Sequence, residues 1–431
     1  MVNVYMETYG CSANQLHSEV MLGVLKRGGC EIVRNPEIAD VLIINTCIVK
    51  DPTEKKMIYR IQNLKKSYPN KKIIIAGCMP MGEYDVLKKI APGASLLGPN
   101  NCLDVLKCVK KTVEGNVVEY LDRRKEAKLC KPKIRFNDFI DIVEISQGCL
   151  GHCTYCIVKN AKGELKSYPP EEIIKDIEMS LNTGCKEIWL TSQDCGCYGK
   201  DIGVTLIDLL RRIDKINGKF RTRVGMMNPD NVFGMIDELI ECYESDKIYK
   251  FLHIPVQSGS DDILIKMNRF YNIKKFKEIV KRFREKLPDV TLWTDIIVGF
   301  PGESEKNFNE TADLIKEIKP DFVNVSKFGA RPGTEAEKME QLDADTIKKR
   351  SKIISELVGK ISLEKNKEWI GRNCIVLVTK KGKNRNQYIG RNESYKPVLI
   401  ENDKNGEELR GKFVKAKIID ATQTHLVGVV V

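Results

Sequence analysis

The chain has 431 residues, more than a single hydrophobic core usually organises, so we expect two or three domains. Hydrophobic residues make up 42% and charged residues 30% of the sequence, a balance that excludes an intrinsically disordered or membrane-spanning chain. Lys and Arg residues, 71 in all, outnumber 59 Asp and Glu residues, and the resulting net charge of +12 fits a polyanionic partner.

The first residues, MVNVYMETYGC, contain no basic stretch followed by an apolar one, and no later apolar run is long enough to cross a bilayer. We therefore expect no secretion signal, no membrane partner and a cytoplasmic location. The 15 cysteines then indicate metal binding or thiol chemistry rather than a disulfide framework, because the cytoplasm keeps thiols reduced.

Short apolar strands alternate with amphipathic helices at the start of the chain. These elements are predicted at residues 2–10 (strand), 14–26 (helix), 41–47 (strand), 53–66 (helix) and 71–78 (strand). The alternation is typical of a parallel sheet covered by helices. A polar stretch at Asp122–Lys133, rich in Lys and Arg, predicts a linker, so we expect a first α/β domain over residues 1–130.

A second alternating series follows, with helical segments such as Pro170–Leu181 and Glu303–Ile318 between its strands. Six strands are predicted, at residues 139–146, 187–193, 221–227, 251–257, 291–300 and 321–328. Six βα units predict an open, partial version of a TIM-type barrel over residues 135–366. In such a barrel the functional site lies at the carboxyl ends of the strands.

The last part of the chain changes character after a long amphipathic helix predicted at Asp343–Glu364. Short strands are predicted at residues 374–380, 387–391, 396–400 and 412–420, with Gly-, Asn- and Lys-rich turns between them. They fit a small antiparallel barrel over residues 367–431. This segment holds 13 Lys and Arg against 7 Asp and Glu residues, so half of the excess positive charge is concentrated there. The predicted fold class is thus α/β with a terminal β-barrel.

The strongest functional signal is ISQGCLGHCTYC, which follows the first strand of the second series directly and is called the cysteine loop below. Cys149, Cys153 and Cys156 at this spacing can hold three irons of a [4Fe-4S] cluster and leave the fourth iron open. An open iron can bind the amino and carboxylate groups of a ligand. The alternative is a closed zinc site completed by His152 or by a distant cysteine.

Three further cysteines, called the strand-end cysteines, each end a predicted strand of the first domain. Cys11, Cys47 and Cys78 follow METYG, IINT and IIAG at equivalent places in successive βα units. Because the carboxyl ends of parallel strands share one edge of a sheet, these thiols are expected to converge. We interpret them as ligands of a second cluster with an open iron. The alternative is that all three are buried as small hydrophobic side chains.

Motifs along nearly the whole chain resemble the methylthiotransferase family of radical S-adenosylmethionine enzymes. In chain order they are YGCSANQLHSE, NTC, AGC, QGCLGHCTYC, HIPVQSGSDDILIKMNR, TDIIVGFPGE and RPGTEA. The basic last domain is similar to the TRAM domain of that family, an RNA-binding module. The stretch TSQDCGCYGKDIG and the short TRAM tail are most similar to the archaeal and eukaryotic branch. That branch acts on N6-threonylcarbamoyladenosine beside the anticodon of tRNA.

The resemblance implies two [4Fe-4S] clusters and S-adenosylmethionine as cofactors. One electron from the cluster on the cysteine loop splits S-adenosylmethionine into methionine and a 5′-deoxyadenosyl radical, which can abstract the C2 hydrogen of the adenine. The cluster on the strand-end cysteines presents a sulfur that another S-adenosylmethionine has methylated. A sulfur donor and an external electron donor, with a potential at or below about −400 mV, are implied as partners together with tRNA.

Polar residues at the strand ends of such a barrel are expected to face the cofactor. By the resemblance, Tyr155 lies against the adenine of S-adenosylmethionine, with core packing as the alternative. Further cofactor contacts are expected from Gln193, Asp194, Gln257, Ser258 and Glu303. The alternative for these five residues is ordinary loop capping.

Five basic side chains are expected around turns of the terminal barrel, where they can reach phosphates without being buried. They are Lys380, Lys381, Lys383, Arg385 and Arg391. Phosphate contacts would position the RNA and leave the choice of base to the active site. The alternative is a solvated lysine-rich face.

Several residues near the expected site carry less information. Cys195 and Cys197 follow the second strand of the barrel and either tune a cluster or, as we favour, pack as small thiols. Lys162 stands where the family more often has arginine, and His17 where aspartate is common. His253 lies inside an apolar strand and is interpreted as a core histidine.

Three other functions remain to be distinguished. A methylthiotransferase that acts on a ribosomal protein side chain shares both clusters and the barrel, and another candidate substrate is N6-isopentenyladenosine in tRNA. A non-catalytic RNA-binding protein with closed zinc sites belongs to a different class. It predicts no brown colour after anaerobic purification and no formation of deoxyadenosine.

Overall fold

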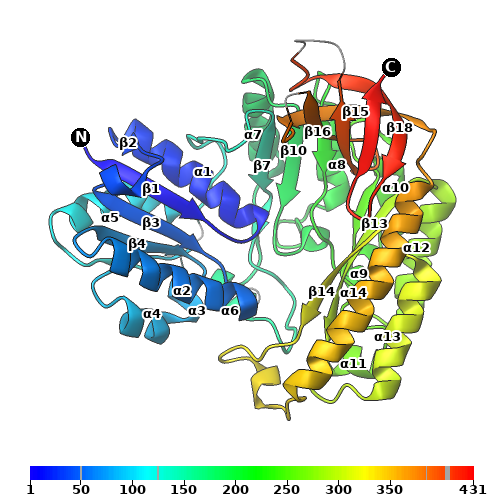
Figure 1. The fold of residues 1–431 in the computed structure, drawn as a ribbon, viewed down its shortest axis with the longest axis horizontal. Coiled ribbons are helices and arrows are strands. Elements are labelled where there is room, and N and C mark those ends of the chain that lie inside the picture. Colours follow the sequence, from blue (N-terminus) through cyan, green and yellow to red (C-terminus); the bar gives the residue numbers. More distant parts are fainter. Residues whose placement is uncertain (49–50, 124–125, 385, 403–407) are drawn as a thin grey trace.

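The computed structural model describes residues 1–48, 51–123, 126–384, 386–402 and 408–431. Its first part is a parallel sheet with helices on both faces (Figure 1). The strands are β1 (Asn3–Thr8), β2 (Glu31–Ile32), β3 (Val41–Thr46), β4 (Lys72–Gly77), β5 (Ser95–Leu97) and β6 (Glu119–Tyr120), in the spatial order β2-β1-β3-β4-β5-β6. The helices are α1 (Ser12–Arg27), α2 (Asp51–Ser67), α3 (Met79–Gly82), α4 (Tyr84–Ile90) and α5 (Val105–Val113), with short 3-10 turns at Pro36–Ile38 and Cys102–Asp104.

The central strands of this sheet are apolar throughout because both of its faces are covered. All six residues of β3 are buried, and their side chains alternate between two cores. Leu42 and Ile44 pack in the core that contains α2 and α4, whereas Val41 and Ile43 pack in the core that contains α1 and α5. The carboxyl ends of β1, β3 and β4 therefore lie side by side, as the sequence predicts.

The second part is an open barrel of parallel strands arranged in two sheets. One sheet has the order β11-β10-β7 and the other β12-β13-β14, so within the described residues the barrel stays open between β7 and β14. The strands are β7 (Ile140–Glu144), β10 (Glu187–Thr191), β11 (Arg221–Arg223), β12 (Phe251–His253), β13 (Thr291–Val298) and β14 (Phe322–Lys327). The two-residue strands β8 (Ser146–Gln147) and β9 (Lys166–Ser167) pair beside the cysteine loop.

Helices cover the outside of this barrel and bury its main core. They are α7 (Pro170–Asn182), α8 (Leu206–Asp214), α9 (Pro229–Phe233), α10 (Ile236–Glu244), α11 (Asp261–Lys266), α12 (Ile273–Lys286) and α13 (Glu305–Ile318), with 3-10 turns at Cys195–Cys197 and Glu335–Lys338. The short helix α6 (Val158–Lys162) follows the cysteine loop and packs against α3 of the first part. Along β13, Leu292 and Ile296 pack into the core beneath the helices, and the partly exposed Trp293, Asp295 and Ile297 alternate with them. Because strand side chains alternate between faces, these three residues point into the lumen.

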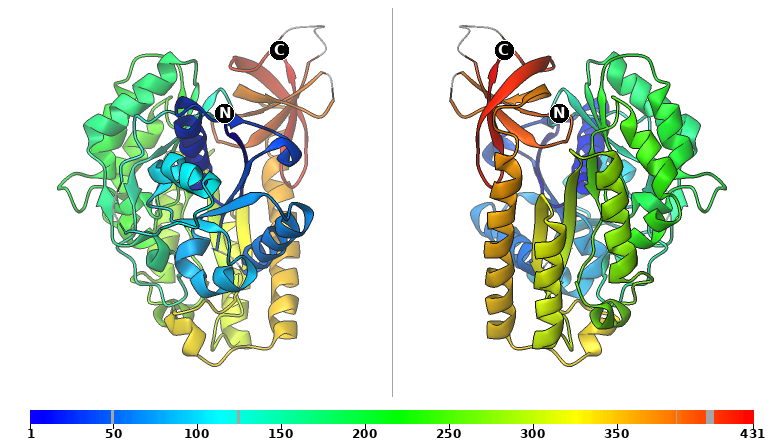
Figure 2. Two further views of the ribbon diagram at one scale, coloured as in Figure 1. Left: turned by 90° about the vertical axis from the view of Figure 1, so that its left-hand side faces the viewer. Right: turned by 90° about the vertical axis from the view of Figure 1, so that its right-hand side faces the viewer.

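The third part is a closed five-stranded barrel in the order β15-β16-β17-β19-β18, reached through the long helix α14 (Ala344–Lys367), as Figures 1 and 2 show. Its strands are β15 (Asn373–Lys381), β16 (Gln387–Arg391), β17 (Pro397–Glu401), β18 (Phe413–Ala421) and β19 (Leu426–Val430). The predicted small barrel is confirmed, with a fifth strand, β19, that was not predicted and one parallel pair, β17 and β19, among otherwise antiparallel pairs. An odd number of strands cannot close with every neighbouring pair antiparallel.

The segment predicted as a linker packs closely against the open barrel. Lys128 is 1% exposed, and its ammonium group lies 3.2 Å from the carboxylate of Glu144. Lys133 pairs with Asp141 at 3.1 Å and with Asp176 at 2.9 Å. Buried ion pairs thus attach this segment to β7 and α7. Among the described residues, no helix combines the length and apolar character needed to span a bilayer.

Candidate functional site

A cavity of about 360 Å³ lies at the carboxyl ends of the barrel strands. Its wall includes the three cysteines of the cysteine loop and Cys11 from the first part of the chain. Residues that follow β10, β11 and β12 complete the wall, among them Gln193, Asn228 and Gln257. The first sheet and the open barrel therefore share one cleft.

Hydrogen-bond donors surround the sulfur atoms of the cysteine loop. The backbone N–H of Gly151 donates to Cys149 Sγ at 3.2 Å, and Arg269 Nη1 donates to Cys153 Sγ at 3.2 Å. Burial raises the pKa of Cys149 to about 11 and also raises the pKa of Cys156, so these thiols hold their protons until a metal displaces them. Donors of this kind stabilise the charge on cluster thiolates.

Arg269 is a functional residue that the sequence analysis did not single out. Its Nη2 donates to Asn228 Oδ1 at 3.1 Å and to the carbonyl oxygen of Pro255 at 3.3 Å, and its Nε donates to the hydroxyl of Tyr271 at 3.1 Å. The guanidinium is therefore held rigidly against Cys153. Its position as the last residue of the motif HIPVQSGSDDILIKMNR was the signal that could have found it.

The strand-end cysteines are drawn together by Asn14 of α1. Asn14 Nδ2 donates to the carbonyl oxygens of Tyr9 at 3.0 Å and Thr46 at 2.7 Å, next to Cys11 and Cys47 in the chain. The thiol of Cys78 donates to Asn14 Oδ1 at 3.8 Å, and the N–H of Cys78 donates to Thr46 O at 3.1 Å. One buried amide thus contacts all three strand ends.

Gly10 lets the Cys11 turn approach the second strand end closely. Its φ of +107° lies in the region that glycine favours, and a Cβ placed on it would lie 2.6 Å from the Cβ of Cys47. Any other residue would separate the two cysteines. Within the described part of the chain, no three His, Cys, Asp or Glu side chains converge tightly enough to hold a single metal ion.

Buried charges lie behind the strand-end cysteines. Burial raises the pKa of Cys78 to about 12, and the positive charge of Lys162 acts in the opposite direction. Lys162 is 4% exposed, and its ammonium group has no hydrogen-bond partner among the described residues. Burial, with the nearby Lys162 and Lys128, lowers the pKa of His17 to about 3, so its ring is neutral where it lies 3.4 Å from Glu144.

Four of the six residues expected to contact S-adenosylmethionine line the cavity: Tyr155, Gln193, Asp194 and Gln257. The ring of Tyr155 packs edge-on against Phe300, with 6.3 Å between ring centres, and Gln193 Oε1 has no partner among the described residues. The carboxylate of Asp194 instead accepts hydrogen bonds from the N–H groups of Gly196 and Asn228 and from the side chain of Asn231. Asp194 thus holds neighbouring loops in place.

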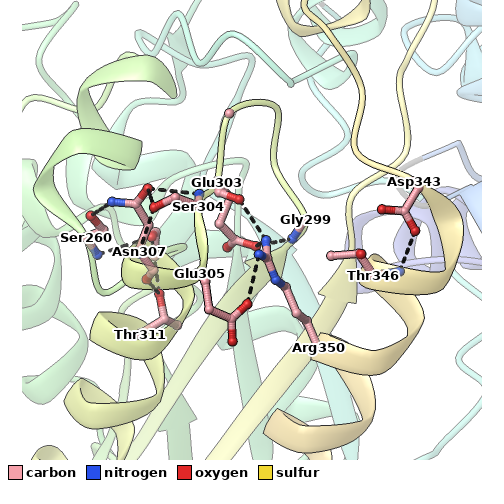
Figure 3. A network of polar contacts seen from close by, with 12 residues as sticks. Ser260, Gly299, Glu303, Ser304, Glu305, Asn307, Thr311, Asp343, Thr346 and Arg350 are labelled. Carbon is pink, nitrogen blue, oxygen red and sulfur yellow. Dashed lines mark hydrogen bonds and ion pairs between the residues drawn. The ribbon is translucent and has the colours of Figure 1, made fainter.

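Glu303 and Ser258, the other two residues expected to contact the cofactor, do not line this cavity. Glu303 is 3% exposed; it accepts the N–H of Gly299 at 2.8 Å and pairs with Arg350 of α14 at 2.7 Å (Figure 3). Ser258 is fully buried, and its hydroxyl accepts the N–H of Ser260 at 3.2 Å. Both residues cap loops, the alternative that the sequence analysis left open.

Two polar residues that the sequence analysis did not assign to the site, His253 and Arg223, also line the cavity. His253 Nε2 lies 2.9 Å from Asp295 Oδ2, and its side chain is 13% exposed, so it is a hydrogen-bonded histidine that also borders the cavity. Arg223 makes no hydrogen bond or ion pair with any described residue and stacks over Trp189, 5.4 Å from the ring centre. By contrast, Cys195 and Cys197 are fully buried outside the cavity, as packed thiols are expected to be.

The basic residues expected to contact RNA occupy different environments. Lys380, Lys381 and Lys383 are exposed on β15 and the turn that follows it. Arg385 lies outside the described residues. Arg391 does not project from a turn as expected, because its guanidinium lies 4.0 Å from the ring centre of Tyr395 and donates to Tyr395 O at 3.1 Å. It therefore faces the interior of the molecule.

Three family models match consecutive stretches of the chain. They are described as Uncharacterized protein family UPF0004 (residues 3–98), Radical SAM superfamily (residues 143–315) and TRAM domain (residues 367–431). The matches correspond to the parallel sheet, to most of the open barrel and to the terminal barrel.

Curated relatives match from end to end. A probable threonylcarbamoyladenosine tRNA methylthiotransferase of Pyrococcus abyssi is 43% identical and covers 99% of both chains. The threonylcarbamoyladenosine tRNA methylthiotransferase of Xenopus laevis is 38% identical over 99% of this chain and 76% of its own. Among solved structures, a radical S-adenosylmethionine methyltransferase from Kitasatospora setae shares the fold, with a TM-score of 0.57 at 13% identity over 78% of this chain and 73% of its own. The chain therefore belongs to the threonylcarbamoyladenosine tRNA methylthiotransferase family of radical S-adenosylmethionine enzymes.

Proposed function

We propose that this chain is a tRNA methylthiotransferase that converts N6-threonylcarbamoyladenosine next to the anticodon into its 2-methylthio derivative. The observation that carries the proposal is the shared cavity, whose wall contains Cys11 from one candidate cluster site and all three cysteines of the other. Cys47 and Cys78 lie outside this lining, so the strand-end set reaches the cavity through Cys11. Two candidate cluster sites that border one cavity can bring a sulfur source and a radical source to the same substrate atom. The names of relatives that match the whole chain support the choice of substrate.

The cofactors of this family are two [4Fe-4S] clusters and S-adenosylmethionine, and the residues of the cavity fit them. We assign one cluster to Cys149, Cys153 and Cys156 and the other to the strand-end cysteines, because each set supplies three free thiols, the number that leaves one iron of a [4Fe-4S] cluster open. When bound, these groups supply an electron, a 5′-deoxyadenosyl radical and a methylated sulfur. The C2–H bond of adenine is neither acidic nor electrophilic, so the reaction requires such a radical.

The residues of the chain bind and orient these groups. Arg269 holds the Cys153 sulfur with a charged hydrogen bond, and Asn14 fixes the three strand-end turns relative to one another. Tyr155, Gln193 and Gln257 form the wall against which S-adenosylmethionine is placed, and Asp194 keeps the adjoining loops closed over it. The apolar lining and the enclosure of the cavity keep water away from a reactive radical.

We assign one role to each of the three domains of the chain. Residues 1–130 form the domain that carries the strand-end cysteines, residues 135–366 the radical domain, and residues 367–431 the RNA-binding domain. Lys380, Lys381 and Lys383 contact tRNA phosphates, since their ammonium groups are exposed on the terminal barrel. An external low-potential electron donor and a sulfur donor complete the reaction, which takes place in the cytoplasm.

The decisive experiment is anaerobic reconstitution of the full chain, followed by incubation with S-adenosylmethionine, dithionite and tRNA that carries threonylcarbamoyladenosine. We expect nucleoside mass analysis to detect one added methylthio group on that base. Transcripts with isopentenyladenosine and isolated ribosomal proteins serve as competing substrates. The proposal fails if either competitor is modified and threonylcarbamoyladenosine is not.

A further inference from the structure

We propose that His253, Asp295 and Asn324 form the subsite that positions the target adenine, with the Asp295 carboxylate accepting a hydrogen bond from the N6–H of the base. The inference rests on the proposed function, because it takes threonylcarbamoyladenosine as the substrate. It deepens that function by naming residues that recognise the base itself rather than the cofactors or the RNA backbone.

The three residues form a polar row across neighbouring strands of the open barrel. His253 at the end of β12 places Nε2 2.9 Å from Asp295 Oδ2, and Asn324 of β14 donates through Nδ2 to Asp295 Oδ1 at 2.5 Å. Asp295 and Asn324 are register partners in the parallel pairing of β13 and β14. Hydrogen bonds from residues on both neighbouring strands therefore fix the orientation of the Asp295 carboxylate.

One member of this row, His253, lines the cavity, and Asp295 and Asn324 lie next to it outside the cavity lining. His253 belongs to the cavity wall, and the N–H of Gln257, another wall residue, donates to the carbonyl oxygen of Asp295 at 2.8 Å. The side chain of Asp295 is 23% exposed and lies on the lumen face of β13. A group that enters the lumen from the strand ends can consequently reach the carboxylate.

The carboxylate has unused capacity for hydrogen bonds. Two oxygens offer about four lone-pair sites, and among the described residues His253 and Asn324 are the side chains that donate to them, one to each oxygen. A partly buried anion gains stability from every further donor. Adenine substituted at N6 offers one N–H, and its ring nitrogens only accept, so N6–H is the group on the base that complements Asp295.

Flat rings flank the polar row. Trp293, two residues before Asp295, packs against Phe322 of β14 with 4.1 Å between ring centres and 40° between ring planes, and the ring of His253 lies 5.7 Å from that of Trp293. Unpaired RNA bases bind proteins by stacking on aromatic side chains while polar groups read their edges. The lumen of the barrel combines both elements at one place.

The roles of the two ionisable residues differ. Asp295 contacts the base, and His253 is a positioning residue that donates from Nε2 to Asp295; its Nδ1 has no partner among the described residues. No proton transfer is required of either residue, because the subsite binds the base and breaks no bond.

Two anticodon stem-loops test the inference, one with threonylcarbamoyladenosine and one with its N6-methyl derivative, which lacks the N6–H. We expect kcat/KM of the wild-type enzyme to fall on the order of 10- to 100-fold for the methylated RNA, the effect of losing a hydrogen bond to a charged group. Asp295→Asn should lower kcat/KM for the first RNA by a similar factor and reduce the discrimination between the two RNAs. His253→Gln should lower kcat/KM and reduce the discrimination in the same way, by smaller factors.

Asp289→Asn is the matched control, since Asp289 is 60% exposed and pairs with Arg372 away from the cavity. Asp289→Asn should retain the wild-type ratio of kcat/KM between the two RNAs. Iron content and the thermal unfolding midpoint establish that each variant is folded and loaded. The inference is overturned if Asp295→Asn discriminates between the two RNAs as strongly as the wild type. If the wild type modifies neither RNA, the proposed function itself fails, so the two failures are distinguishable.

Discussion

The guanidinium of Arg223, on β11 of the open barrel, lies 5.5 Å from the ring centre of Tyr395 in the terminal barrel. The same guanidinium stacks over Trp189 and Phe251, each at 5.4 Å, and it lines the cavity. The terminal barrel therefore supports a residue of the active-site wall as well as carrying basic surface residues. Removal of the terminal barrel should affect the chemistry and not RNA affinity alone.

Replacement of Tyr395 tests this contact. Tyr395 is 4% exposed, so Tyr395→Ala should leave a cavity and destabilise the fold by about 3–5 kcal/mol, the usual range for a buried aromatic ring. It should also lower kcat/KM, because Arg223 loses a stacking partner. Tyr395→Phe retains the ring and should stay close to the wild type in both thermal unfolding and kinetics. If Tyr395→Ala and Tyr395→Phe had the same stability and the same kcat/KM, the aromatic ring of Tyr395 would have no role in supporting Arg223.

Replacing each cysteine set separately should show how many iron atoms it binds and which step of the reaction it supports. With Cys11, Cys47 and Cys78 changed to Ala, iron should fall from about eight to about four atoms per chain, and methylthiolation should be abolished while S-adenosylmethionine cleavage continues. Replacement of the cysteine-loop thiols should abolish cleavage as well. Cys108, Cys185 and Cys242 are buried outside the cavity, so their triple Ala variant should keep its full iron content. Iron analysis and deoxyadenosine formation measure these outcomes.

The ion pair between Glu303 and Arg350 should contribute strongly to stability. Both side chains are at least 93% buried, so Arg350→Met leaves an uncompensated carboxylate and should cost about 3–5 kcal/mol. Glu305 lies 3.4 Å from the same guanidinium but is 76% exposed, and Glu305→Gln should change stability by less than about 0.5 kcal/mol. Thermal unfolding of the three proteins measures the difference. Comparable losses in both variants would show that burial of the pair does not matter.

The exposed lysines of the terminal barrel should govern the salt dependence of tRNA binding. Changing Lys380, Lys381 and Lys383 together to Ala should weaken binding and lower the slope of log affinity against log salt by about 0.7 to 0.9 for each phosphate that the variant no longer neutralises. A triple Ala variant of Lys281, Lys306 and Lys352 removes the same charge from helices of the open barrel, where the three side chains are at least 69% exposed. An unchanged slope in the first variant, measured by titration at several salt concentrations, contradicts the assignment.

Glu83 should make stability depend on pH. Burial, together with the neighbouring Glu54, raises the pKa of Glu83 to about 7, although Arg331 opposes the shift. In the unfolded chain this carboxyl ionises near pH 4.5, so the unfolded state releases its proton first, and stability falls as the pH rises from about 4.5 to 7. Glu83→Gln should remove this fall and be more stable than the wild type at pH 8. Glu114→Gln, at a 56% exposed site, should follow the wild type.

The sequence alone predicts the order of the main strands and helices of the first sheet and the open barrel, and it predicts two sets of candidate cluster thiols. Short apolar runs placed the central strands of the first sheet, both of whose faces are covered, and segments of period 3.6 placed the helices between the strands. The cysteine loop was identifiable because Cys149, Cys153 and Cys156 lie within eight residues, so their proximity is local. The strand-end cysteines were identifiable because parallel strands bring equivalent positions to one edge.

Only the tertiary structure decided which side chains face the cavity. Glu303 turns toward Arg350, and Arg391 turns toward Tyr395, because helix α14 and the terminal barrel pack where the sequence pattern contains no information about them. His253 gains its partner from a strand 42 residues away. A side chain at a strand end can point to either face of its loop, and the choice depends on contacts between segments that are distant in sequence.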